Sequence, residues 1–177
     1  MPSPTAPSTP AKVEDFQDFV AARGTHLYRT ACLLTGGDTH LAEDLVQETL
    51  GRMYAGWGGR RRIDNPAGYA QTVLVNAFIS SRRKKSSREQ PVAEVRHPAA
   101  AVGDGDADLR LTLVAALGRL APQDRAVLVL RYWEDRSVED TATALKLTAG
   151  AVRSRSGRAL ARLRDQLGAD FPEFAEY

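Results

Sequence analysis

Apolar residues recur at spacings of three and four over most of the chain, which is the period of an amphipathic α-helix. Alternating patterns are short, and β-branched residues sit at helical spacings, so we predict an all-α fold. The first predicted helix ends at Gly36-Gly37, because glycine pairs commonly terminate helices. Its apolar face consists of Phe16, Val20, Leu27, Ala31 and Leu34.

A second helix is predicted from about Leu41 to Trp57, with Asp38 placed to cap its N-terminus. Four apolar residues at helical spacing form its predicted buried stripe, while the opposite side carries two leucines among carboxylates. Either another helix of the same domain covers these leucines, or they belong to a docking face for a basic partner. The stripe is Val46, Leu50, Met53 and Trp57, and the opposite side is Leu41, Asp44, Leu45 and Glu48.

A basic and aromatic segment comes next. The loop Gly58–Arg62 is flexible and basic, and Asn65-Pro66 is a helix start in which the asparagine caps and the proline occupies the first turn. Residues 65–88 contain no acid. A basic run is commonly a solvated helix end, but cations beside aromatic rings and an amide also suit single-stranded nucleic acid. The residues that favour the second interpretation are Tyr69, Asn76, Phe78 and the run Arg82-Arg83-Lys84-Lys85.

The last third of the chain has the pattern of a helix-turn-helix. A helix starting at Pro122 is followed by Ser137, which begins a short capped helix to Leu145. The turn Lys146–Thr148 then leads into a long helix to about Leu167. From Lys146 to Arg164 there are six basic residues and no acid, whereas an ordinary surface helix mixes both signs. We therefore predict that this helix enters the major groove of DNA.

Charge and composition divide the chain into parts. The net charge of +2 conceals an acidic segment, residues 89–108, which has five acids, one arginine and no apolar period, and which we predict to be a flexible linker. No apolar stretch is long enough to span a bilayer and the start of the chain lacks a secretory pattern, so we predict a cytoplasmic protein. The predicted parts are a disordered leader (1–12), a first helical unit (13–88), the linker (89–108), a second helical unit (109–168) and a tail (169–177).

Two other classes of protein remain open from these patterns. A stand-alone helix-turn-helix regulator explains residues 109–167 but leaves the carboxylate-bearing helix and the basic-aromatic segment without a role. An enzyme would need a nucleophile with a base, metal ligands or a phosphate-binding loop. The histidines are scattered, Cys32 stands alone in an apolar helix, and no zinc-ligand spacing occurs, so we predict no catalytic residues, metal or cofactor.

Four segments in order resemble the extracytoplasmic-function (ECF) class of sigma factors in the sigma-70 family. The amino-acid sequence of these motifs is similar to that of the SigE-like actinobacterial branch of this class. The match spans about residues 13–167. The four segments are Leu41-Ala42-Glu43-Asp44-Leu45-Val46-Gln47-Glu48-Thr49, Asn65-Pro66 with Tyr69 and Asn76, Leu120-Ala121-Pro122 with Arg125 and Leu130-Arg131-Tyr132-Trp133-Glu134, and Thr148-Ala149-Gly150-Ala151-Val152-Arg153-Ser154-Arg155.

The resemblance implies two small helical domains, sigma region 2 and sigma region 4, and a non-enzymatic role in directing RNA polymerase to promoters and helping to melt them. It implies three sites and three partners: the core polymerase (β′ clamp helices and β flap), promoter DNA and, in many such systems, an anti-sigma factor. The polymerase-docking residues would be Leu41, Asp44, Leu45, Gln47 and Glu48; the −10 residues Arg61, Arg62, Asn65, Tyr69, Asn76, Arg82, Arg83 and Lys84; and the −35 residues Thr148, Arg153, Ser154, Arg155, Arg158 and Arg162.

The chain departs from the family pattern at several positions. Tyr69 stands where tryptophan is frequent, which leaves the −10 preference open. Ser156 stands where leucine is usual on the buried face of the last helix, and Gly157 costs about 1 kcal/mol of helix stability relative to alanine. These two residues predict a somewhat loose recognition helix.

Overall fold

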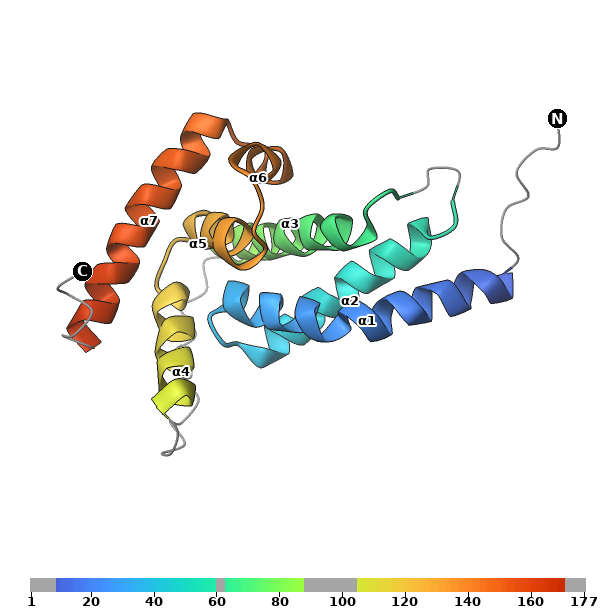
Figure 1. Cartoon of the computed structure of the whole chain (residues 1–177), viewed down its shortest axis with the longest axis horizontal. Coiled ribbons are helices and arrows are strands. Elements are labelled where there is room, and N and C mark those ends of the chain that lie inside the picture. The colour runs from blue at the N-terminus through green and yellow to red at the C-terminus, as the bar shows by residue number, and fades with distance from the viewer. Residues whose placement is uncertain (1–8, 60–62, 88–104, 171–177) are drawn as a thin grey trace.

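The computed structural model describes residues 9–59, 63–87 and 105–170, and within these ranges all regular structure is helical, which confirms the all-α prediction. The N-terminal unit comprises α1 (Thr9–Thr35), α2 (Thr39–Gly56) and α3 (Pro66–Ser87). The C-terminal unit comprises α4 (Gly105–Gly118), α5 (Pro122–Leu128), the π-helical turn η1 (Val129–Trp133), α6 (Val138–Leu145) and α7 (Ala149–Asp170). In Figure 1, α1 and α2 run antiparallel beside α3, and α7 stands at the far end of the molecule.

Local signals in the sequence set most helix ends. Gly36 and Gly37 adopt φ values of 68° and 91°, a left-handed conformation that turns the chain sharply after α1. The Asp38 side chain accepts a hydrogen bond from the Leu41 amide at 3.0 Å and so caps α2 as predicted. Asn65 caps α3 by accepting from the Gly68 amide at 2.9 Å.

The predicted helix-turn-helix is confirmed. Ser137 caps α6 by accepting from the Asp140 amide at 2.9 Å, and Thr148 caps α7 by accepting from the Ala151 amide at 3.1 Å. Between the two helices, Lys146 has a φ of 55°, the left-handed conformation that commonly ends a helix. The turn between α6 and α7 is thus formed by the left-handed Lys146 and the capping residue Thr148.

Two helices begin before the predicted starts of the two helical units. The helix α1 already begins at Thr9, inside the predicted leader, because a proline such as Pro10 is tolerated in the first turn of a helix. The helix α4 begins at Gly105, inside the predicted linker, although most of that acidic segment lies outside the described residues. Both helices thus begin about one helical turn before residues 13 and 109, the predicted starts of the two units.

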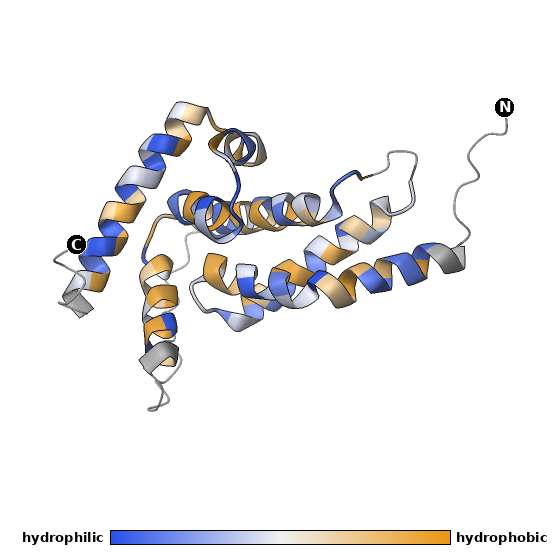
Figure 2. Ribbon diagram, viewed as in Figure 1, coloured by the Kyte–Doolittle hydropathy of each residue, from blue (hydrophilic) through white to orange (hydrophobic). Residues whose placement is uncertain are grey.

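The two helical units pack against each other. The α3 helix contacts both α5 and α6, and α1 contacts α4, α5 and η1. Apolar side chains of both units share one buried cluster, and Figure 2 shows hydrophobic positions interspersed with hydrophilic ones along the helices of both units. The largest fully buried apolar members come from α1 (Leu34), α2 (Leu45, Met53), α3 (Leu74, Val75, Phe78), α5 and η1 (Val127, Leu130) and α7 (Val152).

Arg125 joins the two units at the base of this cluster. The side chain is 1% exposed, and its guanidinium donates to the carbonyl oxygens of Leu34 at 2.6 Å, Gly118 at 2.6 Å and Leu120 at 2.9 Å. It also lies over the Phe78 ring, 5.5 Å from the ring centroid. Burial lowers the pKa of Arg125 to about 10, with a smaller contribution from the charge of Arg82, so the guanidinium stays protonated at neutral pH. A buried cation thus satisfies carbonyls at the ends of α1 and α4.

Candidate nucleic-acid and protein interfaces

The outward face of α2 is acidic and polar. Its exposed residues recur at spacings of three and four, which places them on a single side of the helix. Glu48 forms an exposed ion pair with Arg52 at 2.5 Å, a contact that contributes little to stability. Three carboxylates therefore face solvent along about two turns, a surface that suits a basic protein partner. The exposed residues of this face are His40, Glu43, Asp44, Gln47 and Glu48.

The predicted exposure of the two leucines on this helix is wrong. Leu45 is 2% exposed and lies in the main buried cluster, and Leu41 is half-buried against that cluster. The buried stripe is Ala42, Leu45, Thr49 and Met53, rotated from the predicted stripe, of which only Met53 is fully buried. Small residues such as Ala42 allow α2 to pack closely, and the larger Val46, Leu50 and Trp57 lie at the edges of the contact. Of the two alternatives, coverage by helices of the same chain is the correct one for the leucines.

The predicted −10 residues of α3 fall into different environments. The side-chain oxygen of Asn65 accepts the capping hydrogen bond of α3. Arg61 and Arg62 lie outside the described residues. Tyr69 is 45% exposed and available for stacking. The amide of Asn76 donates to the carbonyl of Thr72 at 2.9 Å and to that of Ala144, in α6, at 3.1 Å.

The basic end of α3 is partly packed and partly exposed. The Arg82 guanidinium lies over the Phe78 ring at 5.9 Å and is partly buried, whereas Arg83 and Lys84 are exposed. Cations at the C-terminus of a helix interact favourably with the helix dipole, so these basic residues also have a structural role in α3. The exposed pair is also placed to meet phosphates beyond the end of the helix.

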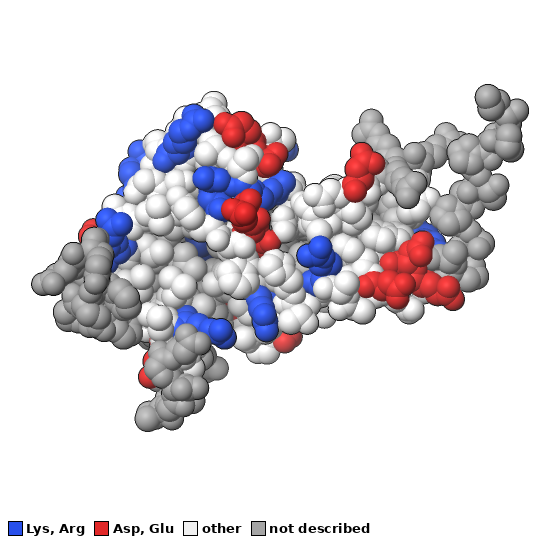
Figure 3. Space-filling model, viewed as in Figure 1, with Lys and Arg blue, Asp and Glu red and all other residues white. Residues whose placement is uncertain are grey.

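The recognition helix α7 presents part of its basic row to solvent. Arg153, Ser154, Arg158 and Arg162 are exposed. Arg155, by contrast, is half-buried, and its guanidinium donates to Asp124 of α5 at 2.7 Å. In Figure 3, Lys and Arg side chains gather over the α7 end of the molecule, and acids gather over the start of α1.

Asp124 is a residue of this surface that sequence reasoning missed. Its side chain is 8% exposed, and besides Arg155 it lies 3.5 Å from Arg162. A second carboxylate, Glu139 of α6, lies 3.3 Å from Arg153. The segment from Lys146 to Arg164 has no acid of its own, but neighbouring helices supply acids through tertiary contacts that charge counting along the chain does not detect.

Glu134, just after η1, is the second missed residue. Its carboxylate is 2% exposed and accepts a hydrogen bond from Thr30 Oγ1 of α1 at 2.5 Å and one from Gln71 Nε2 of α3 at 2.5 Å. The Nε2 atom of His26 lies 2.8 Å from the same carboxylate. The motif quoted for region 4 ends on this residue, but nothing in the motif indicates that it reaches the other unit.

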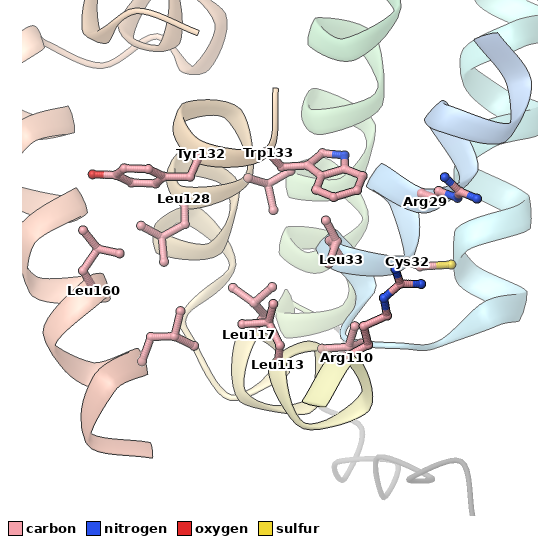
Figure 4. Close-up of a pocket in the computed structure, with 13 residues that line it drawn as sticks. Arg29, Cys32, Leu33, Arg110, Leu113, Leu117, Leu128, Tyr132, Trp133 and Leu160 are labelled. Atoms are coloured by element: carbon pink, nitrogen blue, oxygen red, sulfur yellow. The ribbon is translucent and has the colours of Figure 1, made fainter. Parts of the chain in front are cut away.

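An apolar pocket of about 450 Å³ lies between α1, α4, η1 and α7. Figure 4 shows Leu113 and Leu117 of α4 at its floor, Tyr132 and Trp133 across from them, and Cys32 on the α1 side. Burial raises the pKa of the Cys32 thiol, partly offset by its hydrogen bond with Tyr28, so this cysteine is a neutral thiol at physiological pH. The lining therefore offers apolar contact and no activated nucleophile among these described side chains.

Two further absences concern the described ranges 9–59, 63–87 and 105–170 alone. No group of three or more His, Cys, Asp or Glu residues there has an arrangement that holds a metal ion. No helix within the same ranges is long and apolar enough to cross a membrane.

Comparison with known proteins matches both units. Residues 19–88 match the model of sigma-70 region 2, and residues 116–165 match that of sigma-70 region 4. RNA polymerase sigma-E factor of Streptomyces avermitilis is 38% identical over 159 residues, covering 88% of this chain and 87% of its own. ECF RNA polymerase sigma factor SigE of Mycolicibacterium smegmatis is 32% identical over 178 residues, covering 94% of this chain and 66% of its own.

Solved structures agree with these matches. The sigma factor RpoE of Bartonella quintana, in complex with the anti-sigma factor NepR, superposes with a TM-score of 0.71 at 28% identity, covering 89% of this chain and 99% of its own. The structure of CnrH with the cytosolic domain of CnrY gives a TM-score of 0.60 at 27% identity, covering 88% of each chain. The chain therefore belongs to the ECF class of the sigma-70 family, and the sigma-E names of the Streptomyces relatives confirm the SigE-like resemblance.

Family membership defines the function at the level of class. The protein is a sigma factor that acts in promoter-directed transcription initiation. The presence of region 2 over residues 19–88 excludes the stand-alone helix-turn-helix regulator, because such a regulator has no use for this region.

Proposed function

We propose that this sigma factor docks on core RNA polymerase through the acidic face of α2. The observation that carries the proposal is that Glu43, Asp44, Gln47 and Glu48 remain exposed while every neighbouring apolar residue of the helix is covered or half-covered. The basic β′ clamp helices are the complementary partner, and paired charges of opposite sign also accelerate encounter. The docking surface is thus electrostatic, without the two leucines predicted from sequence.

The second part of the proposal concerns the −10 element. Tyr69 offers an exposed ring on which an unpaired base stacks, and Arg83 and Lys84 lie at the end of the same helix to hold phosphates. Extracting a base from the duplex costs a few kcal/mol, which stacking and hydrogen bonding in a pocket offset. Asn76 supplies the hydrogen bonds to the base edge once its contact with Ala144 is released.

The third part concerns the −35 element, which α7 reads from the major groove while region 4 rests on the β flap. Thr148 caps the helix end that enters the groove, and Arg153, Ser154 and Arg158 are exposed near that end. Arg162 is one turn further along and contacts phosphate. The pairing of Arg155 with Asp124 gives that residue the role of holding α7 on α5.

The remaining parts of the proposal follow from the class. The protein makes and breaks no bonds itself, uses no cofactor and acts in the cytoplasm with the polymerase. An anti-sigma factor is a further partner, since the RpoE and CnrH structures are complexes of that kind.

Run-off transcription tests the proposed function directly. Purified core polymerase with the chain is expected to initiate at a distinct set of promoters on a fragmented genomic template, whereas core alone is not. A matched variant, Asp44→Arg with Glu48→Arg, is expected to remove the transcripts because it reverses the charge of the docking face. Initiation that is the same with and without the chain would refute the proposed function.

A further inference from the structure

The apolar pocket between α1, α4, η1 and α7 lies where the molecule leaves large apolar side chains exposed. Tyr132 is 57% exposed, Trp133 44% and Leu160 37%, and all three line this pocket. Three of the six large hydrophobic residues that are exposed within the described ranges therefore gather at one concave surface. Exposed apolar surface that is gathered in this way commonly marks a binding site.

The volume and the shape of the pocket suit a small organic molecule. Ligand sites in proteins have volumes of about 300–1,000 Å³ and are lined mainly by apolar side chains with a few polar groups. This pocket has a volume of about 450 Å³, and side chains from four helical elements line it. Helical segments of partner proteins, in contrast, lie along an extended groove that receives side chains from successive turns.

The charged side chains at the pocket are of one sign. Arg29 of α1 and Arg110 of α4 line it, and the described residues of the lining include no acid. Arg29 is exposed and has no hydrogen bond or ion pair with any described residue. Glu43 of α2 lies close enough to raise the pKa of the Cys32 thiol, but it does not line the pocket. An anionic group at this place would therefore meet an unpaired cation.

The two ends of the pocket differ in polarity. Figure 4 shows the guanidinium groups of Arg29 and Arg110 on the α1 side, whereas Leu160 lies on the α7 side. A molecule with an anionic head and an apolar tail matches this arrangement. Its carboxylate can accept two parallel hydrogen bonds from a guanidinium, and its tail can cover the leucines of the pocket and remove them from water.

We propose that this pocket binds a free medium-chain fatty acid, with the carboxylate on Arg29 and the alkyl chain running over Leu113 and Leu117 of α4 toward Leu160 of α7. A single-chain acid matches the pocket better than a two-chain lipid, because the volume is near the lower end of the range for small-molecule sites. The inference concerns a ligand of the free protein, so it does not depend on the proposed contacts with polymerase and promoter.

The cysteine of the pocket makes its occupancy measurable. Cys32 is the only cysteine of the chain and lines the pocket, so the rate at which N-ethylmaleimide modifies it reports access to this site. Burial raises the pKa of the thiol, so the reaction is followed at slightly alkaline pH. Octanoate, decanoate and dodecanoate, each below its micelle concentration, are expected to protect Cys32 saturably with one ligand per protein.

Isothermal titration calorimetry measures how affinity depends on chain length. Each methylene group that enters the pocket is expected to raise the affinity about fourfold, because it leaves water for an apolar environment. The increase is expected to stop once the chain fills the pocket. 1-Decanol serves as the uncharged counterpart of decanoate, and vesicles of phosphatidylglycerol serve as the membrane counterpart.

Two variants separate the role of the head from that of the chain. Arg29→Glu is expected to weaken decanoate at least about tenfold and to leave 1-decanol unchanged, because only the acid is charged. Its matched control is Arg23→Glu, an exposed cation of the same helix that does not line the pocket. Leu160→Trp is expected to fill the pocket and weaken both ligands, whereas Ala161→Trp, exposed next to it and outside the lining, is expected to bind as wild type.

All four variants change exposed residues, and circular dichroism verifies that each is folded. Four outcomes overturn the inference. The first is that no fatty acid slows the modification of Cys32. The second is that Arg29→Glu weakens decanoate and 1-decanol equally, which would indicate a merely apolar surface. The third is protection by vesicles alone. The fourth is protection by core polymerase or by a higher concentration of the protein itself, without protection by any fatty acid, which would identify the pocket as a protein contact.

Discussion

Helices α2 and α7 are both amphipathic and both carry rows of charge of a single sign, yet they present those charges differently. On α2 the acidic side chains Glu43, Asp44 and Glu48 all face solvent. On α7 the basic row is divided, because Asp124 of α5 takes Arg155 out of it. A run of like charges along a sequence therefore shows which charged side chains a helix carries. The neighbouring helices determine how many of those side chains remain exposed to solvent.

The first test of this comparison concerns the buried side of α2. Leu45→Ala is expected to lower the free energy of unfolding by about 2–5 kcal/mol, because the leucine is 2% exposed in the main cluster. Chemical denaturation followed by circular dichroism measures the change. Gln47→Ala, on the exposed side of the same helix, is the control and is expected to have almost no effect. Equal stability of the two variants would mean that the leucine belongs to the docking face.

The exposed side of α2 gives the next largest effect. Asp44→Arg with Glu48→Arg is expected to weaken binding to core polymerase by about 100-fold, because like charges facing each other across an interface cost several kcal/mol. The matched control is Glu14→Arg with Asp18→Arg, two exposed acids at the same spacing on α1, which is expected to bind as wild type. Co-purification and competition with wild type measure the affinity. An equal loss from both pairs would show that net charge, rather than the α2 face, governs docking.

The divided row on α7 is tested by separating two arginines. Arg158→Ala is expected to remove about 1–3 kcal/mol of discrimination at a −35 base pair, because this exposed residue is placed to bond a base edge. Arg155→Ala is expected to leave base preference intact and to lower stability by about 1–3 kcal/mol, since Asp124 loses its main charged partner.

Holoenzyme binding to a panel of −35 point variants at several salt concentrations distinguishes these roles. Arg162→Ala is the control for phosphate contact and is expected to lower the log–log salt slope by about one without changing base preference. Loss of preference from Arg155→Ala, with none from Arg158→Ala, would place α7 at a different rotation in the groove.

The smallest effect concerns the buried side of α7. The Ser156 hydroxyl is buried and has no hydrogen-bond partner among the described residues. Ser156→Ala is therefore expected to raise the free energy of unfolding by about 1 kcal/mol, because an unpaired buried hydroxyl is costly. The exposed Ser154→Ala, which changes helix propensity equally, is expected to gain only a few tenths. A thermal melt in which both variants gain the same stability would indicate that the Ser156 hydroxyl is satisfied.

Sequence patterns predicted α7 better than α2, and the reason is physical. On α7 the buried side is marked by Val152 and Ala159, both fully buried, and Ser156 lies on the same side as predicted. On α2 the closest packing uses Ala42 and Thr49, whose small or polar side chains carry no hydrophobic signal, so larger residues at the edges were mistaken for the centre. Capping residues and the glycine pair were predictable because each acts within its own turn.

Contacts between the two units were beyond sequence reasoning. Residues 26, 71 and 134 are far apart in the chain and each is an ordinary polar residue, so nothing local indicates that they meet. The family resemblance predicted which surfaces act on polymerase and promoter. It gave no sign that Asn76, predicted as a DNA contact, is bonded to Ala144.

The π-helical turn η1 has a genetic consequence. In η1 the amide of Glu134 bonds to the carbonyl of Val129 five residues earlier, at 3.0 Å, so this turn holds one residue more than an α-helical turn. A turn closed by such bonds absorbs its extra residue by being wider, so the chain leaves it in nearly the same direction as it leaves an α-turn. Deleting one codon within Val129–Trp133 in a way that restores an α-turn is therefore expected to leave the Glu134 carboxylate facing Thr30 and Gln71. Related genes that differ by three base pairs at this turn are thus expected to keep the same contacts between the two units.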